Sequence, residues 1–274
     1  MELIELLKMI VIGVIQGITE WLPVSSTGHM ILAESILQPN VRPDFWSIFL
    51  VVIQFGSILA VVLLFWEKIF PFKFRGGFRM DVDKIQLWMK IVVAVFPAAV
   101  IGLLFDEALE AMFFNPTTVA ITLIGYGVLF IIIESQNKNR RTRINDLNQI
   151  TYKFAFWIGM FQLLALIPGT SRSGATIIGG LLLGASRYIA SEFTFFLAIP
   201  VMFGASLLRI LRVGLDFTAA EWIYLGAGTL VAFVVSILAI KFLLSYIKRN
   251  DFKLFGWYRI VLGLLVIGYF YFWI

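Results

Sequence analysis

The chain has 274 residues, of which 60% are hydrophobic and 14% are charged, and its net charge is +5. Soluble domains carry roughly 25% charged residues, so this composition excludes an ordinary soluble enzyme. The chain contains no cysteine, which excludes disulfides and thiolate metal sites. The basic residues lie in short loops between apolar segments, so we expect no nucleic-acid partner.

Long apolar runs recur along the chain, each close to the ~20 residues that a helix needs to cross a hydrocarbon core. A membrane β-barrel would show short alternating segments instead, and we find none. The sequence therefore predicts an all-α polytopic membrane protein in contact with membrane lipids. We expect full spans near 44–66, 86–104, 117–135, 189–211, 221–246 and 254–273.

Two further apolar segments, 3–37 and 152–184, are interrupted by proline and small polar residues. Proline removes a backbone donor and clashes with the preceding turn, so we expect helices to end near Pro23 and Pro168. The result is two re-entrant helix-loop-helix segments beside six full spans. The N-terminus has acids before its apolar run and no small-residue cleavage site, so we expect mature structure and not a signal peptide.

Loop charges predict the orientation of the spans. Cytoplasmic loops carry an excess of Lys and Arg, which places three basic loops in the cytoplasm and requires each broken segment to begin and end on one side. Arg209 and Arg212 then fall on the outer side and count against this assignment. The basic loops are 67–90, 136–153 and 248–253, whereas 105–116 is acidic.

The two broken segments resemble each other. "IGVIQGITEWLPVSSTGHMI" (12–31) and "IGMFQLLALIPGTSRSGATI" (158–177) share Ile, Gly, Gln, Ser and Thr/Ser positions at a shift of 146 residues. Each half holds one broken segment and three spans, and an odd number of spans inverts the second half. We therefore expect one membrane domain, 1–274, with inverted repeats at 1–137 and 150–274. The alternative is chance similarity between apolar segments.

Each break predicts a polar pocket at membrane depth, because non-helical backbone there must be covered by protein or by a water-filled cavity. Ser25 or Ser26 is suited to cap the helix after the first break, and Thr170 or Ser171 the helix after the second. The N-terminus of such a helix has free N–H groups and a partial positive charge, which favour an anion such as phosphate.

Three ionisable side chains stand in these breaks. Arg172 has a planar fork that suits phosphate, and an intramembrane arginine is a functional hypothesis by default; the alternative is a structural ion pair with Glu20. Gln16 lies four residues before Glu20, on the same helix face. His29, the only histidine, follows Ser26 by three residues, as in an activated nucleophile. Alternatively, His29 caps its own helix.

The segments "QGITEWLPVSSTGHM" and "PGTSRSG" resemble the two signature motifs of the bacterial undecaprenyl-diphosphatases of the bacitracin-resistance type. The resemblance covers the whole chain in length and span layout, although Gln16 stands where many members have glutamate. It implies hydrolysis of undecaprenyl diphosphate to undecaprenyl phosphate and inorganic phosphate, which recycles the lipid carrier of cell-wall synthesis. It also implies a site that opens to the outer face of the bacterial cytoplasmic membrane.

On this resemblance we expect Ser26 to attack the terminal phosphorus and His29 to take its proton or protonate the leaving group. The rival assignment makes His29 the nucleophile and Ser26 a ligand. Glu20, with Gln16, would hold a divalent cation, Mg²⁺ or Ca²⁺. Arg172 would stabilise the transferring phosphoryl group. The other residues expected to bind phosphate are Ser25, Thr27, Gly169, Thr170, Ser171 and Ser173.

Two other classes of function compete with the phosphatase. A secondary transporter or flippase for a lipid phosphate or another anion would also use inverted repeats and half-helices, but it does not need the close Ser, His, Glu and Arg set. A purely structural membrane protein leaves Glu20 and Arg172 unexplained. The sequence leaves open a homodimer.

Overall fold

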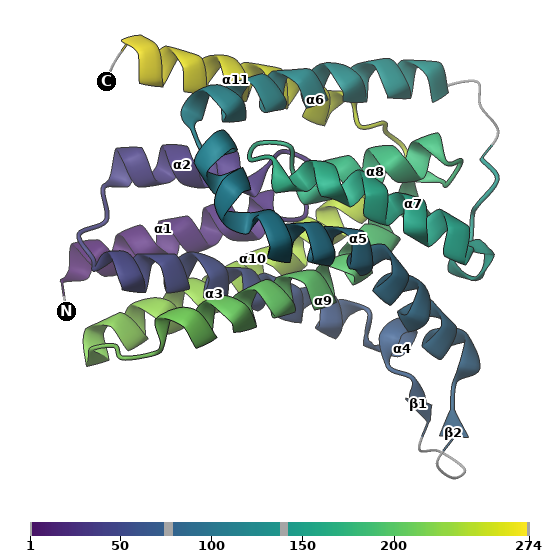
Figure 1. The fold of residues 1–274 in the computed structure, drawn as a ribbon, viewed down its shortest axis with the longest axis horizontal. Coiled ribbons are helices and arrows are strands. Elements are labelled where there is room, and N and C mark those ends of the chain that lie inside the picture. The colour runs from purple at the N-terminus through teal and green to yellow at the C-terminus, as the bar shows by residue number, and fades with distance from the viewer. Residues whose placement is uncertain (1, 74–78, 138–141, 273–274) are drawn as a thin grey trace.

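The computed structural model of the chain describes residues 2–73, 79–137 and 142–272. Within these residues, six helices are long and apolar enough to cross a membrane. This confirms the all-α polytopic class, and each long helix overlaps one expected span (Figure 1). The six are α3 (Pro43–Leu64), α5 (Val82–Phe113), α6 (Pro116–Asn137), α9 (Arg187–Val213), α10 (Ala219–Tyr246) and α11 (Lys253–Phe272).

The two interrupted segments are broken near the expected prolines. The first forms α1 (Leu3–Thr19) and α2 (Ser26–Leu37), and the second forms α7 (Tyr152–Leu163), the 3-10 turn η2 (Leu164–Leu166) and α8 (Arg172–Leu182). The remaining elements are short: α4 (Trp66–Ile69), β1 (Phe72–Lys73), antiparallel β2 (Arg79–Met80) and the 3-10 turn η1 (Leu147–Gln149).

Each broken segment returns to the end of the bundle where it began. The ammonium of Lys8 in α1 donates to the carbonyl of Gln38, just after α2, at 3.1 Å. In the second segment, the N–H of Arg143, which precedes α7, donates to the carbonyl of Gly184 after α8 at 2.8 Å. This path is the one that the loop charges require, whereas the inverted repeat and membrane re-entry stay predictions.

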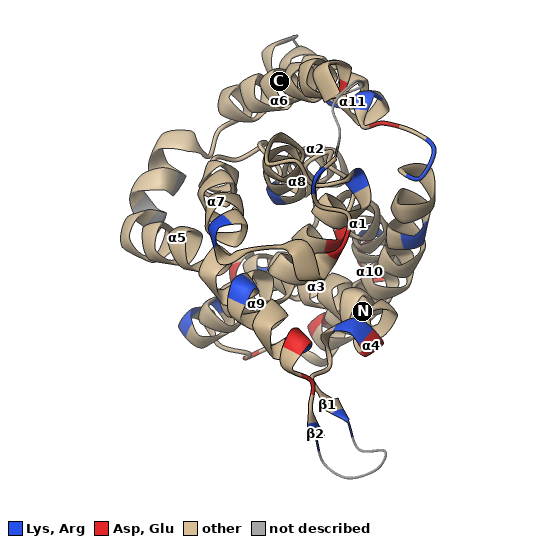
Figure 2. Cartoon of the chain, turned by 90° about the vertical axis from the view of Figure 1, so that its right-hand side faces the viewer, with Lys and Arg blue, Asp and Glu red and all other residues tan. Residues whose placement is uncertain are grey.

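Contacts between the connecting segments place the basic loops at one end of the bundle. Lys68 pairs with Glu192 at 2.6 Å, and Arg187 pairs with Glu134 at 2.6 Å. Glu134 also accepts from the N–H of Phe252 at 3.1 Å, which joins the turn before α11 to the same end. Figure 2 views this end, with the Lys and Arg positions of the ribbon in blue. Four cations of the basic loops lie outside the described residues, namely Arg75, Lys138, Arg140 and Arg141.

Two features differ from the expected span boundaries. The acidic segment 105–116 was expected to be a loop, but α5 continues through most of it to Phe113, and the side chains of Asp106, Glu107 and Glu110 lie outside the described residues. A helix can extend beyond the hydrocarbon layer, so the end of an apolar run does not mark the end of the helix. Pro97 and Pro200 also lie inside α5 and α9 without ending them, because neighbouring groups can satisfy the freed carbonyls.

Helix α1 is held against α10 by close backbone approach. A Cβ at Gly13 would lie 2.6 Å from the carbonyl oxygen of Gly228, and one at Gly17 would lie 2.8 Å from that of Ala232. Small residues permit such contact between membrane helices. The C-terminal end of α1, where Glu20 follows, is therefore fixed relative to the long helices.

Candidate active site

The two breaks end in the same local conformation. Ser25 has φ 72° and ψ 98°, and Ser171 has φ 72° and ψ 119°. Each hydroxyl accepts a hydrogen bond from an N–H three residues later, that of Gly28 at 3.3 Å and that of Gly174 at 3.1 Å. Positive φ is uncommon for a residue with a side chain and clusters at functional sites. Of the alternatives left open by the sequence, Ser25 and Ser171 are the caps.

This capping leaves further donors at the start of each helix. The first N–H groups of a helix have no partner within it, and in the described part of the chain the N–H groups of Ser26, Thr27, Arg172 and Ser173 donate no backbone hydrogen bond. Both N-termini border one cavity. Helices α2 and α8 therefore present donors and partial positive charge to the same volume.

A cavity of about 150 Å³ lies where the two breaks meet. It combines residues that are far apart in the sequence, Glu20 and Ser26 from the first break with Arg172 from the second. Seven of the expected site residues line it, namely Glu20, Ser26, Thr27, Gly169, Ser171, Arg172 and Ser173. Ser25 and Thr170 lie behind this surface, with 1% and 0% of their area exposed.

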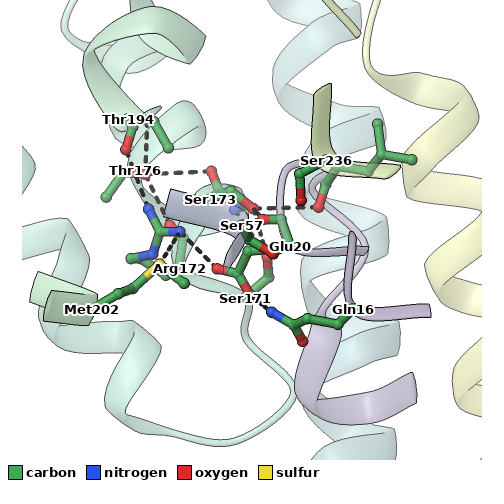
Figure 3. A network of polar contacts seen from close by, with 12 residues as sticks. Gln16, Glu20, Ser57, Ser171, Arg172, Ser173, Thr176, Thr194, Met202 and Ser236 are labelled. Atoms are coloured by element: carbon green, nitrogen blue, oxygen red, sulfur yellow. Dashed lines mark hydrogen bonds and ion pairs between the residues drawn. The ribbon is translucent and has the colours of Figure 1, made fainter. Parts of the chain in front are cut away.

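The cavity wall carries an ion pair between the two breaks. The Nη2 atom of Arg172 lies 2.7 Å from Oε1 of Glu20, and Nε2 of Gln16 donates to Oε2 of Glu20 at 2.9 Å. Arg172 also donates to the carbonyl of Thr194 at 3.2 Å and to the sulfur of Met202 at 3.3 Å (Figure 3). The ion pair that we considered as a structural alternative is therefore formed, yet both of its members line the cavity.

Hydroxyl groups also connect the breaks to each other. Ser173 donates to the carbonyls of Glu20 and Leu22 at 3.4 and 3.3 Å, and its oxygen lies 3.1 Å from that of Ser171. Figure 3 shows these contacts beside the Glu20–Arg172 pair. Ser173 and Ser171 thus fix the geometry of the cavity in addition to lining it. Among the described residues the hydroxyls of Ser26 and Thr27, which also line the cavity, make no such bond.

His29 is engaged away from the cavity. Its Nδ1 lies 2.7 Å from the carbonyl oxygen of Ser25, so Nδ1 carries the proton, because a carbonyl only accepts. Its Nε2 lies 2.7 Å from the hydroxyl of Tyr258, and the two rings stack with centroids 5.6 Å apart. The expected contact between Ser26 and His29 is not formed. To reach the Ser26 proton, the imidazole must leave Tyr258.

Two polar residues at the site escaped the sequence interpretation. Arg259 of α11 is fully buried and contacts both breaks. It lies in the apolar stretch "GWYRIVLG", and the rule on intramembrane arginines that singled out Arg172 also applies to it. Gln54 of α3 lines the cavity, as does Met202 of α9. The segments "DFWSIFLVVIQFG" (44–56) and "EFTFFLAIPVMFG" (192–204) are similar at a shift of 148 residues, which pairs Gln54 with Met202. This signal could have found Gln54.

The donor set for a divalent cation is small. In the described residues no group of three or more His, Asp or Glu side chains is placed to hold a metal ion. Both carboxylate oxygens of Glu20 already accept hydrogen bonds. Cations such as Mg²⁺ bind through one or two carboxylates plus substrate phosphates. Glu20 and the side-chain oxygen of Gln16 therefore fit a cation only when a bound ligand supplies further oxygens.

Gly169 is expected to be intolerant of any side chain. Its φ is +84°, and a Cβ there would lie 2.1 Å from Oγ1 of Thr122 and 2.7 Å from the carbonyl oxygen of Val119. Left-handed φ alone costs roughly 1–2 kcal/mol for an alanine, and the clash adds to it. Gly169→Ala should therefore lower the thermal unfolding temperature of the purified protein by several degrees.

A matched control for Gly169→Ala is Gly125→Ala, because a Cβ at Gly125 meets nothing within 4 Å. This helical alanine should leave the melting temperature unchanged or raise it. Equal melting temperatures for the two variants would show that the second break tolerates displacement, contrary to the close packing seen here.

Comparisons with known proteins show the family of the chain. The family described as bacitracin resistance protein BacA matches residues 9–265. An undecaprenyl-diphosphatase of Desulfitobacterium hafniense is 58% identical over 271 residues, covering 98% of each chain. Those of Lachnoclostridium phytofermentans and Clostridium acetobutylicum are 58% and 56% identical, over 98% of this chain and 98% and 99% of theirs. The chain belongs to the BacA family of bacitracin resistance proteins.

Proposed function

We infer that this protein is an undecaprenyl-diphosphatase, which hydrolyses undecaprenyl diphosphate to undecaprenyl phosphate and inorganic phosphate. The name is that of relatives up to 58% identical over nearly the whole chain. The observation that carries the inference is the cavity in which two helix N-termini, Arg172 and Ser26 converge. Recycling of the lipid carrier for cell-wall synthesis follows from this activity.

The substrate has two parts, and the structure offers a surface for each. The multiply charged diphosphate matches the cavity, because Arg172 and the N-termini of α2 and α8 are its sources of positive charge. The long prenyl tail and the surrounding membrane lipids match the apolar outer surface, where large side chains such as Leu63, Phe96 and Leu104 are exposed. The headgroup and the tail therefore each have a surface of matching chemistry.

In the proposed mechanism, Ser26 attacks the terminal phosphorus. A bond forms between its Oγ and phosphorus, and the bridging P–O bond breaks to release undecaprenyl phosphate. Water then hydrolyses the phosphoserine. Arg172 and the free N–H groups of Thr27 and Ser173 stabilise the charge on the transferring group. His29, turned away from Tyr258, accepts the serine proton and later delivers it.

The rival mechanism makes His29 the nucleophile. Ser26 is favoured because it lines the cavity, whereas both ring nitrogens of His29 bond to Ser25 and Tyr258. The two differ in the covalent intermediate, because a phosphohistidine is labile in acid and a phosphoserine is stable there. Enzyme labelled with the terminal phosphate and quenched in acid should retain the label. Label that survives only a base quench would establish the rival.

A divalent cation is part of the proposal. When bound, it would neutralise phosphate charge. Glu20 and the side-chain oxygen of Gln16 would hold it. Removing divalent ions with a chelator should lower phosphate release at least ~10-fold, and adding back Mg²⁺ or Ca²⁺ should restore it.

Gln16→Glu sharpens this metal prediction, because it supplies a second carboxylate. The variant should need a lower cation concentration for half-maximal activity. Gln54→Glu, on a different helix, should not lower that concentration. Chelator-resistant wild-type activity would remove the cation from the mechanism.

The membrane that holds the protein, and its orientation there, are also inferred. The six apolar helices make the chain a multi-pass membrane protein. We place it in the bacterial cytoplasmic membrane with the three basic loops in the cytoplasm, on the positive-inside rule. The cavity then opens to the outer face, as the family resemblance implies. Because the chain lacks cysteine, a single cysteine at Asn250 should react in cells only with reagents that cross the membrane.

Purified protein in detergent separates the enzyme from the transporter. Detergent removes any second compartment, so transport alone gives no signal. Wild-type protein should release inorganic phosphate from undecaprenyl diphosphate with multiple turnovers. Folded protein that releases none, with and without Mg²⁺ or Ca²⁺, would leave the cavity as an anion-binding site and reject the phosphatase.

A further inference from the structure

Arg259 in α11 joins the two breaks from behind the cavity. None of its area is exposed. Its Nη1 donates to the carbonyl of Pro23 in the first break at 3.2 Å. Its Nη2 donates to the carbonyls of Gly169 and Thr170 in the second break at 2.8 and 3.0 Å. A single side chain thus fixes both non-helical segments to one helix.

The charge of Arg259 has no carboxylate partner. The ion pairs found among the described residues do not include it, and its guanidinium instead lies 5.6 Å from the ring centre of Tyr126. A buried charge that is not paired with an opposite charge is costly. One of its partners, Gly169, lines the cavity. An anion bound in the cavity would therefore lie on the side of the Gly169 peptide opposite to Arg259.

The hydrogen bonds of Arg259 also determine which backbone groups face the cavity. In a trans peptide the N–H points opposite to the C=O. Because the carbonyl of Thr170 is turned to Arg259, the N–H of Ser171 is directed away from it, and Ser171 lines the cavity. That N–H donates no backbone hydrogen bond in the described residues. Arg259 thereby keeps carbonyl oxygens off the surface that would meet an anion.

We propose that Arg259 is the positioning residue of the phosphoryl-binding site. It holds the break carbonyls behind the cavity so that the N–H groups at the starts of α2 and α8 converge on the transferring group. Its charge favours an anion in front of the same peptides. The proposal rests on the proposed phosphatase function, because the donors that Arg259 positions act on the phosphoryl group being transferred.

The test replaces Arg259 with glutamine and compares it with Arg209→Gln, which removes an exposed arginine of α9. The measurements are the melting temperature, kcat and KM for undecaprenyl diphosphate, and the inhibition constant for orthovanadate, which mimics the phosphoryl group in transfer. Arg259→Gln should lower kcat ~100-fold and weaken vanadate inhibition at least ~10-fold, with KM changed less than ~3-fold. Arg209→Gln should match wild type in all four quantities.

Two results would overturn the proposal. One is a folded Arg259→Gln variant with wild-type kcat. The other is a kcat that falls only in proportion to the folded fraction, with an unchanged vanadate constant, because a purely structural role predicts that outcome. If Arg259→Gln does not fold, Arg259→Lys keeps the charge without the fork that spans both breaks, and the same criteria apply to it.

Binding of inorganic diphosphate tests the role of Arg259 independently of phosphatase activity. Calorimetry on wild type and Arg259→Gln measures binding without turnover. Binding to wild type that weakens at least ~10-fold in the variant would support the positioning role even if wild type released no phosphate. Equal binding to both would reject that role even if wild type were an active phosphatase.

Discussion

Arg172→Ala should reduce kcat/KM for undecaprenyl diphosphate at least ~100-fold, a loss of about 2.7 kcal/mol of transition-state stabilisation. Arg172 is the only cation that lines the cavity in the described residues, and it sits at the N-terminus of α8, where the charge of the transferring phosphoryl group would develop. Arg172→Lys should recover only part of the loss, because an ammonium cannot bind two phosphate oxygens side by side.

This result must be separated from loss of folding. Removing one partner of a buried ion pair costs roughly 3–5 kcal/mol, because Glu20 is left uncompensated. Glu20→Gln combined with Arg172→Ala removes both charges, so it should be more stable than Arg172→Ala and equally inactive. If the double variant recovers activity, the arginine serves only to neutralise Glu20. Arg209→Ala, on the exposed part of α9, is the control for arginine removal.

Ser26→Ala should be comparably inactive, with kcat lowered ~100-fold or more, because it removes the proposed attacking oxygen. The fold should be unaffected, because Ser25, and not Ser26, caps α2. Phosphate release and the melting temperature, measured on the same preparation, check both expectations.

Ser25→Ala is the matched control for Ser26→Ala. Loss of the cap should cost about 1 kcal/mol of stability and lower the melting temperature, which Ser26→Ala should not do. If Ser26→Ala retained more than a tenth of wild-type kcat, the attacking group would be another nucleophile, and His29 would be the next to test.

The large features of the fold follow from elementary patterns. Six apolar runs of bilayer length predicted six long helices, and Pro23 and Pro168 predicted the breaks. The same pattern did not show that Pro97 would remain inside a helix. Serine and threonine follow Pro23 and Pro168 and can cap a new helix, so the chain breaks at these two prolines. Pro97 has apolar neighbours that favour continuation of α5.

Seven of the residues that line the cavity were named from the sequence, but Gln54, Arg259 and the contacts among these residues were not. Sequence spacing placed Ser26 and His29 on adjacent turns, yet His29 bonds to Tyr258, which comes from the far end of the chain. The same holds for Arg259, whose four carbonyl partners belong to segments 89 to 236 residues away along the chain. Tertiary contacts of this range leave no periodic signal in the sequence.

The most direct test of the account is whether the diphosphate occupies the cavity between the breaks. The chain has no cysteine, so one introduced at Ala165, a cavity-lining residue without an assigned role, is the only thiol. In a Ser26→Ala background the substrate stays intact. Undecaprenyl diphosphate should then slow alkylation of that thiol at least ~10-fold, and it should leave a cysteine at exposed Asn250 unaffected. Unchanged alkylation at position 165 under saturating substrate would place the diphosphate elsewhere and contradict the account.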